Sequence, residues 1–133
     1  MLRIYFLLMI GLWVLPGIGF TQNTLPDFTV KNNKGKISLI WLNTYAQQVK
    51  GISIQRSFDS SKNFSSIGTI SNPDDEVNGF MDDDVPYAKM FYRLFIAFDS
   101  GAYIFTESQR PEVDSRFDFT ATLKKLREIN AKN

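Results

Sequence analysis

The chain has 133 residues, enough for one domain, and it combines 44% hydrophobic side chains with a nearly balanced 15 basic and 14 acidic residues. It has no histidine and no cysteine, which excludes imidazole general bases, thiolate nucleophiles, disulfide bonds and the most common zinc ligands. It also lacks the basic excess or stripe typical of nucleic-acid binders. Composition therefore favours a small globular protein that is not an enzyme, carries no cofactor and binds no nucleic acid.

Residues 1–21 have the order of a cleavable export signal. Arg3 supplies the positive charge, and the apolar run from Ile4 to Leu15 ends at a Pro-Gly pair followed by small residues. These small residues allow cleavage before Phe20 or before Gln22, and the second site leaves a polar N-terminus. The alternative is an uncleaved anchor, but the run is shorter than the roughly 20 residues that span a bilayer. We expect a periplasmic or secreted protein with no membrane span after the leader is removed.

Beyond the leader, short runs of apolar and β-branched residues alternate with turn signals. Strands are expected at 28–30, 36–42, 52–57, 64–70, 89–99 and 102–108, with turns at 33–35, 59–63 and 99–101 and a polar loop at 72–84. No helical period appears before residue 110. This pattern is typical of an all-β fold in which two antiparallel sheets pack as a sandwich.

The alternation along these strands predicts the core. Side chains two residues apart lie on the same face of a strand, and on that basis one set should fill the space between the sheets. The predicted core consists of Ile37, Leu39, Trp41, Ile52, Ile54, Phe64, Ile67, Tyr92, Leu94 and Ile96.

The strand expected at 89–99 is apolar on both sides, which is unusual for a sheet with one solvated face. One side carries Met90, Tyr92, Leu94 and Ile96. We assign Phe91, Phe95 and Phe98 to the other side. Either the C-terminal tail covers these three residues, or they form a surface that contacts a partner.

The tail from residue 113 to 133 turns helical from about residue 118. Phe119, Leu123, Leu126 and Ile129 form one apolar stripe, and Asp118 or Thr120 would cap the helix. Such a short helix is marginal alone. Docking on its own sheet, packing on a partner and disorder all remain open.

Several spaced elements resemble fibronectin type III domains, most closely the fibronectin type III-like modules of secreted Bacteroidetes proteins. In those modules a strand ending in a core Trp precedes an "ERS-DG-F-IG" hairpin, a linker ending in Asp, and a "YYRL…D-G" hairpin. The matching parts here are Ile37–Trp41, Lys50–Asp59, Phe64, Ile67-Gly68, Asp82–Asp84, Phe91–Leu94, Ala97 and Asp99–Gly101.

The resemblance implies a fibronectin type III/immunoglobulin-like antiparallel β-sandwich over residues 22–112. Gln55 replaces an acid of the pattern and Ser60 replaces its turn glycine, while Met90 stands where a corner Tyr is often found. The family's modules act as spacer or adhesive units. The implied function is a non-catalytic module that contacts another protein or a component of the cell envelope.

The acidic stretch 74–84 offers an alternative function. Asp74, Glu76 and Asn78 match the start of an EF-hand loop, and Asp82 follows, although Val85 replaces its bidentate Glu. Calcium takes six or more oxygen ligands, so these four residues are the candidate calcium ligands of a calcium- or carbohydrate-binding module. Carbohydrate binding by aromatic stacking is disfavoured, because Trp41 is assigned to the core.

Overall fold

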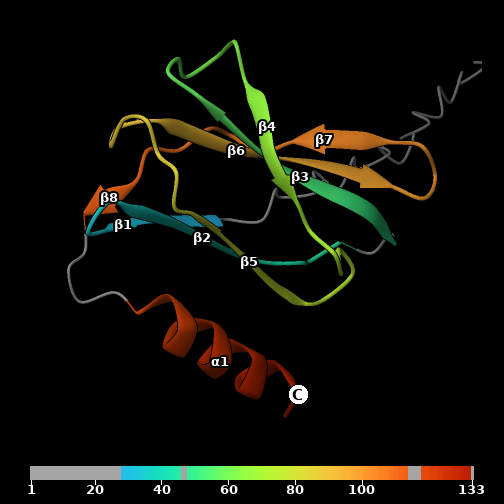
Figure 1. Cartoon of the computed structure of the whole chain (residues 1–133). Helices are drawn as coiled ribbons and strands as arrows, with labels where there is room; N and C mark the ends of the chain where they lie inside the picture. Colours follow the sequence, from blue (N-terminus) through green and yellow to red (C-terminus); the bar gives the residue numbers. More distant parts are fainter. Residues whose placement is uncertain (1–27, 46–47, 114–117, 133) are drawn as a thin grey trace, which may run out of the picture.

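The protein is a sandwich of two four-stranded sheets with one helix packed on the outside (Figure 1). The computed structural model describes residues 28–45, 48–113 and 118–132, so the predicted export signal lies outside these ranges. The elements are β1 (Phe28–Asn33), β2 (Lys36–Leu42), β3 (Val49–Ser57), β4 (Ser65–Thr69), β5 (Val77–Asp82), β6 (Phe91–Phe98), β7 (Tyr103–Phe105), β8 (Glu112–Val113) and α1 (Phe119–Asn130). The sheets have the orders β5-β2-β1-β8 and β4-β3-β6-β7. Neighbouring strands are antiparallel except β1 and β8, so the predicted antiparallel sandwich is confirmed.

The turn predicted at 33–35 closes a tight hairpin between β1 and β2. Asn33 pairs with Lys36, and the two loop residues, Lys34 and Gly35, have φ angles of 54° and 86°. Positive φ at both loop residues suits the right-handed twist of the flanking strands. The side chain of Asn32 also accepts a hydrogen bond from the Gly35 N–H at 3.0 Å, so the turn fixes the register of the hairpin.

The hydrophobic core lies between the two sheets and follows the predicted alternation. Eight of the predicted core residues are buried, namely Ile37, Leu39, Trp41, Ile52, Ile54, Tyr92, Leu94 and Ile96. Ile67 is partly buried against them. The prediction for Phe64 is wrong, because its ring is only half-buried and lies under the guanidinium of Arg93, outside the core.

The predicted loop at 72–84 contains a strand, β5, which sequence reasoning missed. Asn, Gly and Asp are poor strand formers, but β5 pairs along its whole length with the buried strand β2. Asn78 is buried there, and its side-chain amide donates to the carbonyl of Asp75 at 3.0 Å. Pairing with β2 and this local hydrogen bond therefore outweigh the unfavourable strand propensity of the segment.

The C-terminal helix docks on the chain's own first sheet. Asp118 caps α1 by accepting a hydrogen bond from the Ala121 N–H at 2.9 Å, which confirms one of the two predicted caps. A side-chain carbon placed on Gly79 of β5 would lie 3.0 Å from the Phe119 ring and 3.1 Å from Leu123. Glycine therefore allows the helix to approach the sheet. No helix among the described residues is long and apolar enough to cross a membrane.

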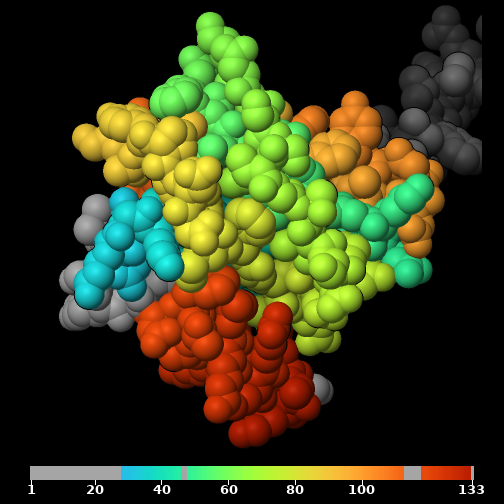
Figure 2. Space-filling view, viewed as in Figure 1, coloured from blue at the N-terminus to red at the C-terminus, as the bar shows by residue number. Residues whose placement is uncertain are grey.

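Docking of α1 explains why β2 is buried on both sides. Ile40 pairs directly with Gly79, and directly paired residues point to the same face of a sheet. Ile40 therefore lies on the face that α1 covers, and it is buried there. The helix makes contacts with β5 and lies on the first sheet, opposite the second (Figures 1 and 2).

Candidate functional site

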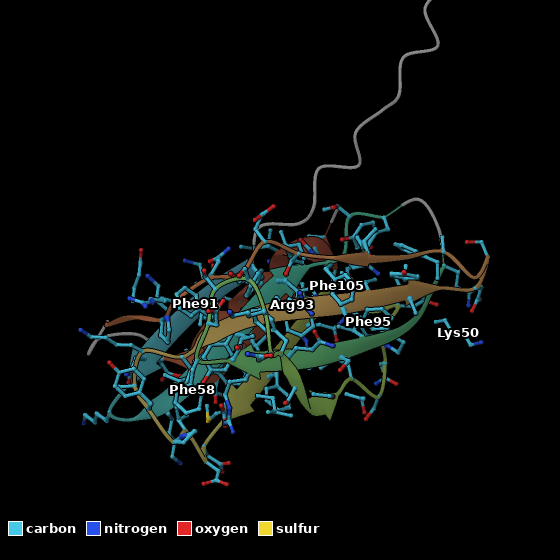
Figure 3. The ribbon with its side chains drawn as sticks, turned by 90° about the horizontal axis from the view of Figure 1, so that it is seen from above. Lys50, Phe58, Phe91, Arg93, Phe95 and Phe105 are labelled. Atoms are coloured by element: carbon cyan, nitrogen blue, oxygen red, sulfur yellow. The ribbon has the colours of Figure 1, made fainter. Side chains whose placement is uncertain are left out.

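The outer face of the second sheet carries a row of aromatic side chains. Phe91, Arg93 and Phe95 follow one another along β6, with Phe105 beside them on β7 (Figure 3). We define the aromatic face as Phe64, Phe91, Arg93, Phe95, Tyr103 and Phe105. Since α1 packs on the first sheet, the helix of the tail does not cover this face. The other explanation for a strand that is apolar on both sides, a surface that contacts a partner, stays a prediction.

Three rings at the β6–β7 end of the aromatic face pack against one another. Phe95 lies 5.6 Å from Tyr103 and 5.1 Å from Phe105 between ring centroids. Tyr103 and Phe105 meet edge to face at 5.9 Å. Tyr103 is nevertheless 62% exposed and Phe105 39% exposed, so a contiguous apolar surface faces outward.

Arg93 lies at the centre of the aromatic face with rings on two sides. Its guanidinium carbon is 4.0 Å from the centroid of Phe64 and 4.2 Å from that of Phe105. Phe64 precedes the edge strand β4, and Phe105 belongs to the opposite edge strand β7. Arg93 Nε donates to the side-chain oxygen of Gln55 at 2.7 Å. Partial burial between these groups lowers the pKa of Arg93, because desolvation disfavours its charged form.

A second arginine lies on the other end of the row. The guanidinium carbon of Arg110 is 4.3 Å from the centroid of the Phe91 ring. Arginine stacks readily on aromatic faces because its planar, weakly hydrated cation meets the negative face of the ring. Aromatic and cationic groups therefore alternate along this side of the molecule.

Phe98, the third residue proposed for partner contact, does not belong to the aromatic face. Its assignment to that face is wrong, because it lies two residues beyond Ile96 and alternation places both on the core side. Phe98 is 2% exposed and meets the ring of Tyr45 edge to face at 5.1 Å. Burial around Tyr45 raises the pKa of its hydroxyl to about 12.

Sequence reasoning missed four members of the aromatic face. Phe64 was assigned to the core, while Arg93, Tyr103 and Phe105 were not singled out. The alternation of Tyr103 and Phe105 in β7 was visible in the sequence. Their closeness to Phe95 follows only from the pairing of Phe95 with Phe105 and of Ala97 with Tyr103.

The structure does not bring the four candidate calcium ligands together. Asp74 and Glu76 precede β5, whereas Asp82 ends it, and five strand steps separate residues by about 17 Å. Asp74 accepts a hydrogen bond from the Val49 N–H at 2.7 Å, and the amide of Asn78 is held by Asp75. Within the ranges that the structure describes, no three acidic side chains cluster as metal ligands would.

Asp82 is instead buried and accepts hydrogen bonds from two side chains and from the Asp84 N–H. Its Oδ2 accepts from Arg56 Nη1 at 2.6 Å and from the Tyr92 hydroxyl at 2.8 Å. Arg56 also donates to the carbonyl of Asp84 at 2.9 Å. Burial, together with the hydrogen bond to Asp82, raises the pKa of Tyr92 far above its ordinary value. This group of three side chains links β3, β5 and β6 across the two sheets.

Comparison with solved structures identifies the architecture. The chain is similar to an Fn3-like protein from Clostridium thermocellum, with a TM-score of 0.54 and 14% identity over 70% of this chain and 95% of that one. It is similar also to the pectate lyase Pel3 from Pectobacterium carotovorum, with a TM-score of 0.54 and 14% identity over 62% of this chain. The match spans 26% of the pectate lyase. Likeness at this identity concerns the fold, which is a fibronectin type III-like β-sandwich.

No protein-family model matches the sequence, and no curated protein matches it.

Proposed function

We propose that this chain is an exported, non-catalytic fibronectin type III-like module that contacts another protein of the cell envelope or exterior through its aromatic face. The observation that carries the proposal is the exposure of Tyr103 and Phe105 on a face that the chain's own helix leaves uncovered. Exposed aromatic residues and arginine are the groups that contribute most to protein–protein contacts. The leader predicted at residues 1–21 supports export to the periplasm or the medium.

The shape of the surface supports a protein partner. The aromatic face lies on a sheet rather than in a deep cleft, and its rings are held by contacts with one another and with Arg93. Side chains that are already ordered lose little conformational entropy when a partner binds. The surface is therefore preorganised for contact with a complementary surface.

Site-specific photocrosslinking tests the contact. A photoreactive phenylalanine replaces Tyr103 in one variant and Tyr87 in a control variant, and both are produced with the leader in the cells that make the protein. Tyr87 is 51% exposed on the loop before β6, so it matches Tyr103 in chemistry and exposure but lies outside the aromatic face.

We expect irradiation to give a covalent adduct of defined mass from position 103 and not from position 87, in the periplasmic or secreted fraction. Adducts of equal yield from both positions, or no adduct from position 103, would contradict a contact through the aromatic face. Recovery of the protein in the cytoplasm alone would contradict export.

A further inference from the structure

We propose that the aromatic face recognises a carboxylate on an acidic segment of the partner protein, with Arg93 as the anchor. This inference rests on the proposed function and adds the chemistry of the partner. Three observations support it: the terminal N–H groups of Arg93 are unpaired within the described residues, the strands around Arg93 carry cations, and the neighbouring rings already contact the guanidinium.

Arg93 has hydrogen-bond donors left over in a fixed position. A guanidinium has five N–H donors in one plane. Nε donates to Gln55, and among the described residues no acceptor is paired with the two terminal nitrogens and no ion pair forms. The guanidinium carbon lies over the rings of Phe64 and Phe105, and the terminal edge, formed by the two Nη atoms, is the one left for a ligand to bind. That edge presents two parallel N–H donors, which match the two oxygens of a carboxylate.

The second sheet has cations and no acids within its strands. β3, β4, β6 and β7 together contain Lys50, Arg56 and Arg93 and neither Asp nor Glu. Arg56 is paired with Asp82, whereas Lys50 and Arg93 form no ion pair with the described residues. Glu107, just after β7, is exposed and likewise unpaired within the described ranges. The strands of this sheet therefore carry an excess of positive charge, which an acidic segment would complement even with Glu107 beside it.

The desolvation of Arg93 also favours binding of a carboxylate. Desolvation lowers the pKa of Arg93, and the partial negative charges of two ring faces and one amide oxygen compensate it only in part. A carboxylate on the terminal edge would add a charge-assisted, bidentate hydrogen bond to a cation that is already partly desolvated and held in place.

Two other occupants fit less well. A second copy of the chain docked through the same face would bring Arg93 and Lys50 against the same cations, and like charges at an interface oppose association. An acidic polysaccharide would stack its sugar rings on aromatic faces, but one face of Phe64 and one of Phe105 already meet Arg93. The outward edges and the free N–H donors favour a peptide.

Binding of synthetic polymers to the purified protein from Gln22 onward, without the predicted leader, tests the inference. The probes are a random copolymer of glutamate and tyrosine, poly-L-lysine, and polygalacturonate as a carboxylated sugar polymer. Calorimetry gives the Kd of each probe for the wild type, Arg93→Lys, Arg93→Gln and the control Arg127→Gln. Arg127 is exposed on α1, so its replacement removes one positive charge away from the aromatic face.

We expect the wild type and Arg127→Gln to bind the glutamate–tyrosine copolymer alike and more tightly than the other two polymers. Both Arg93 variants should bind it at least about tenfold more weakly, because lysine keeps the charge but not the paired donors. Thermal unfolding of each variant checks that it is folded. If Arg93→Gln does not fold, the comparison of the wild type with Arg93→Lys decides the test.

Equal binding by the wild type and Arg93→Lys, tighter binding of polygalacturonate, or no copolymer binding would each overturn the inference. Adducts from position 103 together with no copolymer binding would leave the contact surface intact and reject only the carboxylate. If photocrosslinking from position 103 gave no adduct, the proposed function itself would be rejected.

Discussion

Asp82 shows how one buried carboxylate organises an end of this sandwich. It is 5% exposed and lies between Arg56 of β3 and Tyr92 of β6, with both partners on its Oδ2. A buried ion pair offsets its desolvation only when further hydrogen bonds satisfy both partners. Here the Tyr92 hydroxyl and the Asp84 carbonyl provide them. Asp82 is consequently committed to the fold, although its place in an acidic stretch suggested a metal ligand.

We predict unequal costs for two substitutions in the group formed by Arg56, Asp82 and Tyr92. Asp82→Asn leaves the partly buried Arg56 cation without its counter-charge and should lower the free energy of unfolding by about 3 kcal/mol. Tyr92→Phe removes one hydroxyl from the same oxygen and should cost about 1 kcal/mol. Urea unfolding measures both.

The control for this pair is Asp83→Asn, which changes an exposed neighbour and should alter stability by less than about 0.5 kcal/mol. If Asp82→Asn were no more destabilising than Asp83→Asn, the contacts of Asp82 with Arg56 and Tyr92 would not contribute to stability.

Among the elements, α1 covers the outer face of the first sheet and leaves that of the second sheet exposed. α1 lies on the first sheet above Gly79 and Ile40, and the aromatic face of the second sheet remains outside. The helix has no fully buried residue, and Ile129 of its apolar stripe is 47% exposed. Phe119 and Leu123, in the first half of the helix, lie against Gly79.

Helix docking predicts a graded effect of alanine substitutions. Leu123→Ala removes methyl groups that lie against β5 but are only half-buried, so its cost should be about 1 kcal/mol, below the 2–5 kcal/mol of a fully buried site. Ile54→Ala, in the core, should reach that range, and Ile129→Ala should be close to neutral. Urea unfolding of the three variants checks the order, and a neutral Leu123→Ala would mean that α1 does not dock in solution.

At the scale of the whole molecule, stability depends on the core between the sheets, since the sequence has no cysteine for disulfides. Cations and aromatic rings gather on one outer face, whereas the acids of the 74–84 stretch are divided between the two ends of β5. The sheet topology thus separates the charges that the sequence places close together.

The separation of these acids predicts that calcium has little effect. A ligand that binds only the native state raises its stability, but the candidate ligands Asp74, Glu76, Asn78 and Asp82 do not converge, and calcium would have to displace Arg56 from Asp82. We expect the thermal unfolding midpoint to be the same within error with millimolar calcium and with a chelator. A clear rise with calcium that Asp74→Asn abolishes would restore the calcium hypothesis.

Several features of this protein could be predicted from its sequence: the alternating strands, the hairpin turns at 33–35 and 99–101, the core around Trp41 and the Asp118 cap. These depend on neighbours in the chain, through strand periodicity, turn chemistry and hydrogen bonds within a few residues. Three other features emerge only in the tertiary structure: the register of β5 on β2, the docking of α1 over Gly79, and the position of Arg93 between Phe64 and Phe105. Each joins segments distant in sequence, and their pairing depends on shape and burial that no local pattern encodes.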